Sequence, residues 1–245
     1  MQKIYEIDFA ALSGKEKSKF ILYLRDLAEE CFAEYPFEVA IKAQLLIFTR
    51  WWNSYRLMVP ENPTPKILEI IIEKLWDFQE GKLAQSKFEE FAKCLEAVVL
   101  EIATGDTEKM DEDEKYYDFE AEYFGDWDDC YTSFLIDVSY ICYEICEREI
   151  AWTGVEDILD GDIADLKIPL LEEMEEESNC TAIALEKRAQ QIYSTPTFCK
   201  VIALLQEDIR TALEGESITE LRKRYQKEYL FPPEDCAKVT AEWCW

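Results

Sequence analysis

The chain has 245 residues, of which 49% are hydrophobic and 13% aromatic, so it has material for a large folded core and lacks the composition of a disordered protein. Its formal net charge is −27, which repels nucleic acid and anionic membrane surfaces and attracts cations and basic proteins. High solubility alone is an alternative explanation of this charge.

The first predicted helix spans residues 13–35. Ser13 and Glu16 stand at capping-box spacing at its start, and Pro36 ends it. Four apolar side chains recur at helical spacing along one face: Phe20, Leu24, Leu27 and Cys31. Residues 37–59 are so apolar that we expect a central, buried helix, ending before Pro60.

Two capped helices follow. Thr64 and Gly81 bracket one of them, with Pro65 in its first turn. Ser86 and Glu89 stand at capping-box spacing at the start of the next, and Gly105 ends it. A polar break near residues 104–115 could divide the chain into two subdomains.

A long helix is predicted within residues 126–152. The apolar spacing assigns its inward face to Tyr131, Leu135, Val138, Cys142 and Ile145. The polar positions predicted to face water are Asp137, Glu144, Glu147 and Arg148. Residues 154–180 favour a short helix and an acidic connector.

In the last third of the chain, the pattern predicts three helices. The first spans residues 181–193, the second spans residues 195–215 with Pro196 in the first turn, and the third begins at Ser217, which stands at capping-box spacing from Glu220. The tail that begins at Phe231 cannot start as a helix, and its apolar end could dock on the core. No strand pair, hairpin or fixed-period repeat is evident. We therefore expect one all-α domain over residues 1–245, a compact bundle of about seven to eight helices.

Several classes of site are excluded by missing residues. The chain contains no histidine, which removes Ser-His-Asp and Cys-His nucleophiles and every imidazole metal site. No two glycines are closer than seven residues, which removes the familiar phosphate-binding loops and the GxSxG elbow. We expect no cofactor and no recognisable catalytic site.

The nine cysteines are odd in number, and the N-terminus lacks the pattern of a signal peptide. Cys142 and Cys146 share a helix face and do not form a CxxC pair. Reduced thiols are expected, together with a cytoplasmic location and no membrane span.

Carboxylate metal sites require acids at a defined spacing. An EF-hand register from Asp111 fails, because Lys115 and Tyr116 occupy its fifth and sixth positions. One acidic cluster resembles half of a DDxxD-type magnesium site: Asp126, Asp128 and Asp129. A histidine-free metalloenzyme that uses these ligands is the alternative function.

Nucleic-acid binding is not expected from the basic residues. Arg222, Lys223, Arg224 and Lys227 do not share one helix face, so they favour a role in balancing nearby acids.

The segment DEDEKYYDFEAEYFGDWDDCY, residues 111–131, combines ten acidic side chains with one lysine and seven aromatic residues. Acids steer a basic partner into encounter, and exposed aromatic rings hold it. The candidate contact residues are Asp111, Glu112, Asp113, Glu114, Tyr116, Tyr117, Asp118, Glu120, Glu122, Tyr123, Asp126, Asp128 and Asp129.

Three aromatic residues of this segment are expected to anchor it to the core: Phe124, Trp127 and Tyr131. Phe119 is a further candidate for this role. For Tyr116, Tyr117 and Tyr123 both roles remain open. Helical spacing within the segment also predicts that part of it forms a helix.

Two stretches, SKFILYLRDLAEECFAEYPFEVA (18–40) and WDDCYTSFLIDVSYICYEICEREIAW (127–152), resemble the helical immunity proteins of bacterial polymorphic and contact-dependent toxin systems. The resemblance implies a compact, acidic, mostly helical protein that binds a toxin domain tightly. The leading hypothesis is an inhibitor of a basic partner such as a nuclease toxin. A third hypothesis is a scaffold or homo-oligomer subunit joined through Trp243–Trp245.

Overall fold

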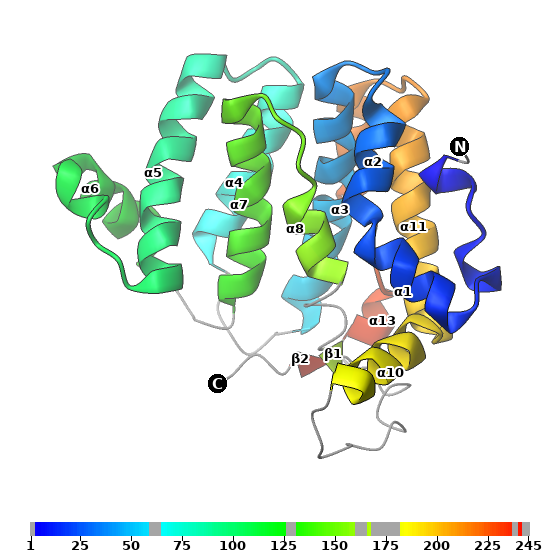
Figure 1. The fold of residues 1–245 in the computed structure, drawn as a ribbon. Helices are drawn as coiled ribbons and strands as arrows, with labels where there is room; N and C mark the ends of the chain where they lie inside the picture. The colour runs from blue at the N-terminus through cyan, green and yellow to red at the C-terminus, as the bar shows by residue number, and fades with distance from the viewer. Residues whose placement is uncertain are drawn as a thin grey trace.

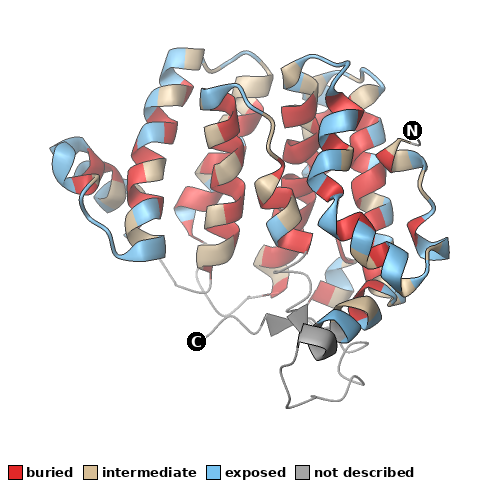
Figure 2. Ribbon diagram, viewed as in Figure 1, coloured by how far each residue is buried: buried red, intermediate tan, exposed pale blue. Residues whose placement is uncertain are grey.

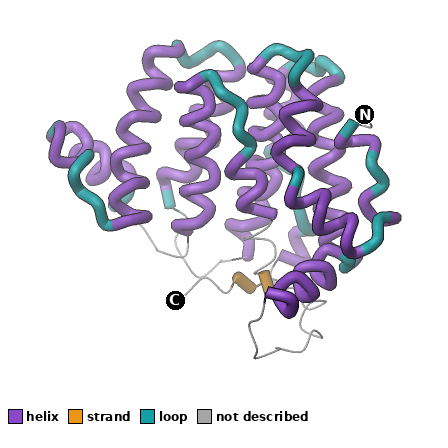
Figure 3. Tube along the Cα trace, viewed as in Figure 1, coloured by secondary structure: helices purple, strands orange, loops and turns teal. Residues whose placement is uncertain are grey.

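A computed structural model describes residues 3–58, 65–125, 131–159, 166–167, 182–236 and 240–241, most of them helical (Figure 3). The longer helices are α3 (Phe37–Met58), α4 (Lys66–Gln79), α5 (Gln85–Thr104), α7 (Thr132–Glu147), α10 (Ala182–Tyr193) and α11 (Pro196–Leu213). The shorter ones are α1 (Gly14–Leu22), α2 (Leu24–Phe32), α6 (Glu114–Tyr123), α8 (Thr153–Asp157), α12 (Ile218–Tyr225) and α13 (Pro233–Cys236).

Short 3₁₀ helices and one minimal strand pair complete the described elements. The 3₁₀ helices are η1 (Ile4–Glu6), η2 (Phe9–Ala11) and η3 (Met110–Glu112). Strand β1 (Leu166–Lys167) pairs antiparallel with β2 (Thr240–Ala241), so that two segments far apart in the chain are joined. The all-α prediction is confirmed, although this small pair was not foreseen.

The described residues contain twelve α-helices, more than the seven to eight expected. One reason is that the helix predicted over 13–35 divides at Tyr23, whose backbone (φ −106°, ψ 17°) leaves helical geometry between α1 and α2. Another is that the tail, which was expected not to start as a helix, forms the short helix α13 two residues after Phe231. Pro233 is tolerated at the first position of α13, because a backbone N–H there would have no partner within the helix.

Helix α3 is the centre of the structure, as predicted. Helices α2, α4, α7, α8, α11, α12 and α13 all pack on it, and its residues are buried almost all round (Figure 2). Aromatic rings join it to α7: the Phe134 ring stacks on Trp52 at 5.4 Å and on Tyr55 at 5.7 Å between centroids.

Helix caps agree with the sequence in some places and not in others. The Ser13–Glu16 capping box forms, and Thr195 caps α11, which begins at Pro196. The box predicted at Ser86 does not form, because α5 already begins at Gln85, whose side chain instead donates to Glu89 at 2.9 Å. Ser217 precedes α12 without a side-chain cap.

The face predicted to point inward on α7 is buried, and Glu147 and Arg148 are exposed as predicted. The predicted exposure of Asp137 and Glu144 is wrong, because both are buried. Helix α7 has α5 on one side and α3 and α8 on the others, so more than one face is covered (Figure 1).

Close packing of α8 on α7 depends on Gly154. A Cβ atom placed there would lie 2.1 Å from the carbonyl oxygen of Asp137, far inside van der Waals contact. Only glycine allows the two backbones to approach this closely.

A buried ion pair ties α3 to the C-terminal helices. Arg50 donates to both carboxylate oxygens of Asp208, at 3.1 and 2.8 Å, and to Glu228 at 3.0 Å. The Tyr225 hydroxyl donates to the same Asp208 at 2.5 Å. Arg50 is 3% exposed and Asp208 1%, so this network is part of the core.

Within the described residues, no helix has both the length and the apolarity required to cross a lipid bilayer.

Candidate partner-binding surface

The acidic segment begins where α5 ends. Gly105 takes the left-handed conformation (φ 70°) that closes the helix, as predicted, and its N–H donates to the Glu101 carbonyl at 2.7 Å. The chain then turns through η3, which the fully buried Met110 anchors. Asp113 caps α6 by accepting a hydrogen bond from the Lys115 N–H at 3.1 Å.

Helix α6 packs on α5 through aromatic side chains and lies at one edge of the molecule (Figure 1). The Phe119 ring meets Phe91 of α5 edge-on at 5.6 Å between centroids. Phe124 and Tyr131 are buried, which confirms their expected anchoring role, and Phe119 is buried as well. The expectation that part of the segment is helical is also confirmed.

The three tyrosines left open by the sequence differ in their surroundings. Tyr116 is 8% exposed and belongs to the packed side of α6, so its ring offers little area to a partner. Tyr123 is half-buried against Phe119, at 4.8 Å between ring centroids. Tyr117 is 42% exposed, and its hydroxyl donates to Asp111 at 2.5 Å. Tyr117 is therefore the tyrosine that presents its ring outward.

Six of the acidic candidates in the same segment are exposed, and Glu120 is half-buried. The exposed acids are Asp111, Glu112, Asp113, Glu114, Asp118 and Glu122. Three further acids of the same region, Glu101, Asp106 and Glu108, extend the charge. We call these ten side chains the α5–α6 acidic surface.

Positive charge within this region is already engaged. Residues 101–125 contain ten acids and two lysines, a net charge of −8. Lys109 pairs with Glu96 at 2.7 Å, and Lys115 pairs with Asp113 at 2.9 Å. Neither lysine is left to neutralise the remaining carboxylates.

Like charges face each other where α5 meets α6. Burial raises the pKa of Glu120, and the carboxylate of Glu101 raises it further. One oxygen of Glu101 is buried and has no hydrogen-bond partner among the described residues. The hydrogen bond to Asp111 raises the pKa of Tyr117, with contributions from burial and from Glu101 and Glu120. Cationic groups of a partner would relieve this repulsion.

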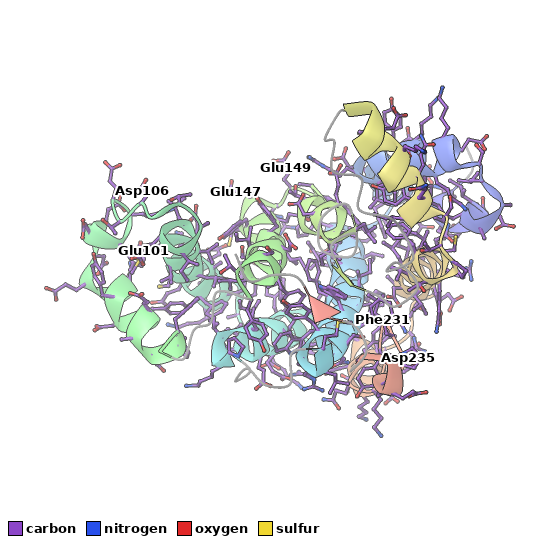
Figure 4. All side chains as sticks on the ribbon, turned by 90° about the horizontal axis from the view of Figure 1, so that it is seen from below. Glu101, Asp106, Glu147, Glu149, Phe231 and Asp235 are labelled. Carbon is purple, nitrogen blue, oxygen red and sulfur yellow. The ribbon has the colours of Figure 1, made fainter. Side chains whose placement is uncertain are left out.

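Glu101, Asp106 and Glu108 were not among the sequence candidates. Figure 4 shows Glu101 and Asp106 at the end of the molecule formed by α5 and α6. One sequence signal was available: Glu101 stands in the last turn of a predicted helix, where the helix dipole disfavours an acid. An acid at such a position can be retained for binding.

Two alternatives rest on residues outside the described part of the chain. The proposed metal ligands, which were also contact candidates, are Asp126, Asp128 and Asp129, and the proposed oligomer contact is Trp243–Trp245. Trp127, an expected anchor, lies outside it as well. Over the residues that the structure describes, no three acidic or cysteine side chains gather in a way that could hold a metal ion.

The basic cluster of α12 balances nearby acids, as predicted. Arg222 reaches three carboxylates of α4 and the turn after it: Glu73, Asp77 and Glu80. Arg224 pairs with Glu216 at 2.9 Å, and Lys223 pairs with Glu220 at 3.4 Å. These three cations therefore take part in ion pairs within the protein.

Comparisons of the chain with protein-family models, with curated proteins and with solved structures each found no match. We therefore infer function from the surface itself.

Proposed function

We propose that this protein binds a basic protein domain through the α5–α6 acidic surface and blocks that domain, as an immunity or inhibitor protein does for a nuclease-type toxin. The supporting observation is the uncompensated charge of residues 101–125, ten acids against two lysines that are already paired. The same charge repels nucleic acid, which supports a basic protein as the partner.

The geometry suits capture of a basic cleft. Long-range attraction between the acids and a positive surface accelerates encounter and selects its orientation. Tyr117 then supplies a large ring of the kind found at binding hot spots, held by its bond to Asp111. Because α6 lies at the edge of the fold, it can enter a partner's cleft while the bundle covers the opening (Figure 1).

Packing on α5 makes the contact surface rigid. The buried Met110 and Phe119 hold η3 and α6, and the Asp113 cap defines where α6 begins. A preformed surface loses less conformational entropy on binding than a mobile acidic segment would. This rigidity favours a tight inhibitor over a loosely attached charged tail.

The test uses a variant neutralised at four acids: Asp111→Asn, Glu112→Gln, Asp113→Asn and Glu114→Gln. Asparagine at 113 preserves the helix cap. The matched control removes the same charge at exposed acids elsewhere: Glu29, Glu34, Glu147 and Glu149, each changed to glutamine.

A pull-down from source-cell lysate is run at low and at high salt with all three proteins. We expect the wild type and the control to retain a stoichiometric basic protein that the neutralised variant loses and that high salt releases. With the captured partner purified, the association rate should fall about tenfold in the neutralised variant and change little in the control. The proposal fails if no basic protein is retained at any salt, or if all three proteins retain it equally.

A further inference from the structure

A second feature of the surface is an apolar groove between the N-terminal segment and the α1–α2 pair. Its volume is about 510 Å³. Its apolar lining consists of Ile7, Leu12, Phe20, Tyr23 and Leu27. We call it the α1–α2 groove. It lies on the side of the molecule opposite α6 (Figure 1), so it does not depend on the function proposed above.

The break between α1 and α2 falls at Tyr23, whose side chain lines this groove. With the helix divided at Tyr23, Leu22 is 67% exposed and Tyr23 51%, the highest exposures among the large hydrophobic residues described. Single exposed apolar residues are common, but an exposed ring that lines an apolar groove, with a second exposed apolar residue next to it in the chain, is typical of an interaction site.

The charges around the groove indicate the chemistry of its partner. Among the described residues that line it, three are acidic, Glu16, Asp26 and Glu30, and one is a cation, Lys19. Bonds from the Ser13 hydroxyl and backbone N–H lower the pKa of Glu16, so it is negatively charged at neutral pH. A complementary ligand carries apolar side chains at its centre and lysine or arginine at its flanks.

The backbone around the groove indicates the partner's secondary structure. The peptide groups of α1 and α2 are hydrogen-bonded within their helices. On the N-terminal wall, the Ile7 carbonyl accepts from the Phe9 N–H and from Gln206, and the Leu12 N–H donates to the Phe9 carbonyl. These engaged groups cannot pair with an added strand. An extended segment bound in the groove would lose the hydrogen bonds that its backbone N–H and C=O groups make to water and would gain none from the groove. A helix satisfies these groups internally and presents side chains at i, i+3, i+4 and i+7 to the groove.

We propose that the α1–α2 groove binds an amphipathic helix of a protein partner, with bulky apolar side chains inserted beside Tyr23 and Leu27 and basic side chains facing Asp26 and Glu30. This contact is separate from the α5–α6 acidic surface. It allows the protein to hold a helical segment at one side while the acidic surface stays free.

The probe is a fluorescein-labelled synthetic helix of about four turns, with leucines on one face and lysines at the flanks. A second peptide carries glutamate in place of lysine, and a third carries serine in place of leucine. Fluorescence anisotropy at physiological salt measures affinity, where general attraction to a protein of this charge is partly screened. We expect binding of the first peptide and at least tenfold weaker binding of the other two.

Protein variants locate the contact. Tyr23→Ala removes an exposed ring, and the double change Asp26→Lys with Glu30→Lys reverses exposed rim charge, so both should fold. The matched control, Asp106→Lys with Glu108→Lys, changes the net charge equally on the α5–α6 acidic surface. Each groove variant should weaken binding about tenfold, and the control less than twofold. Hydrogen exchange should show protection of α1 and α2 by the peptide.

Two results would overturn the proposal. If the control weakens binding as much as the rim variant, the peptide responds to overall charge and not to the groove. If sedimentation shows a dimer that Tyr23→Ala dissociates, a second copy of the chain occupies the groove in place of a partner helix.

Discussion

Replacing Arg50 by methionine should destabilise the fold strongly, because it leaves a buried carboxylate without its countercharge. Arg50 supplies two bonds to Asp208 and a third to Glu228. After the change, the Tyr225 hydroxyl is the one hydrogen-bond donor that Asp208 keeps among the described side chains, and Asp208 is almost fully shielded from water. Methionine is close to the arginine stem in size, so the lost interactions dominate over lost packing.

The size of the expected destabilisation follows from the burial of the Arg50–Asp208 pair. Removing one partner of a buried ion pair costs about 3 to 5 kcal/mol. For a chain of this length, each kcal/mol lowers the melting temperature by about 2 to 4 °C, so a decrease of about 6 to 20 °C is expected. Exposed pairs contribute far less, and Lys87→Met, which removes the exposed pair with Glu90, should leave the melting temperature nearly unchanged.

The pH dependence provides a second check. Burial raises the pKa of Asp208, and Arg50 acts against that rise. Without Arg50 the pKa rises further, so the folded variant takes up a proton more readily than its unfolded chain. A raised folded-state pKa means that stability is lost as pH increases. The loss of unfolding free energy caused by Arg50→Met should therefore be larger at pH 7 than at pH 5.

Urea denaturation of the wild type, Arg50→Met and Lys87→Met at the two pH values measures these differences. A cost below about 1 kcal/mol for Arg50→Met at pH 7 would contradict the assignment of this pair to the dry core. A loss of unfolding free energy that is equal at both pH values would contradict it as well.

Three further predictions concern α6, α7 and α8. Gly154→Ala should destabilise the protein by at least about 1 to 3 kcal/mol in thermal unfolding, because the new Cβ would meet the Asp137 carbonyl. The control Gly125→Ala, whose Cβ would lie 3.7 Å from its nearest neighbour, should cost little. Equal effects of the two changes would refute the close contact at Gly154. Burial raises the pKa of Glu144 from 4.5 to about 7, so the stability that Glu144 contributes is lost as pH rises across that interval. Relative to a Glu144→Gln variant, the wild type should lose about 2 to 3 kcal/mol of unfolding free energy in urea between about pH 4.5 and pH 7.5. A constant difference between the two proteins would show that Glu144 does not titrate in this range. Phe119→Ala should cost about 3 kcal/mol and increase hydrogen exchange of α6 amides more than those of α5, while unchanged exchange in α6 would show that this ring does not anchor it.

Helix positions followed from local features of the sequence. Ser13, Thr195 and Gly105 ended or began helices where the pattern placed them, because caps depend on a few neighbouring residues. The all-round apolar character of α3 also placed it at the centre. These properties depend on contacts within a few turns, so no knowledge of distant segments is required.

Which polar residues are buried depended on tertiary packing. Glu144 stands on a face that looks polar in sequence, yet α3 and α8 cover it. Helical periodicity tells which residues share a face, but not how many neighbouring helices pack on that helix. The break at Tyr23 and the groove beside it were likewise not visible, since one apolar face continues through both helices.

For the candidate surface, the sequence by itself determined the sign and density of charge, because composition alone sets both. Tertiary packing decided the rest: it buried Tyr116, exposed Tyr117 and brought Glu101 beside Glu120. Adjacent residues on one helix point in directions about 100° apart, so which of two neighbouring tyrosines reaches solvent depends on the side that α5 covers.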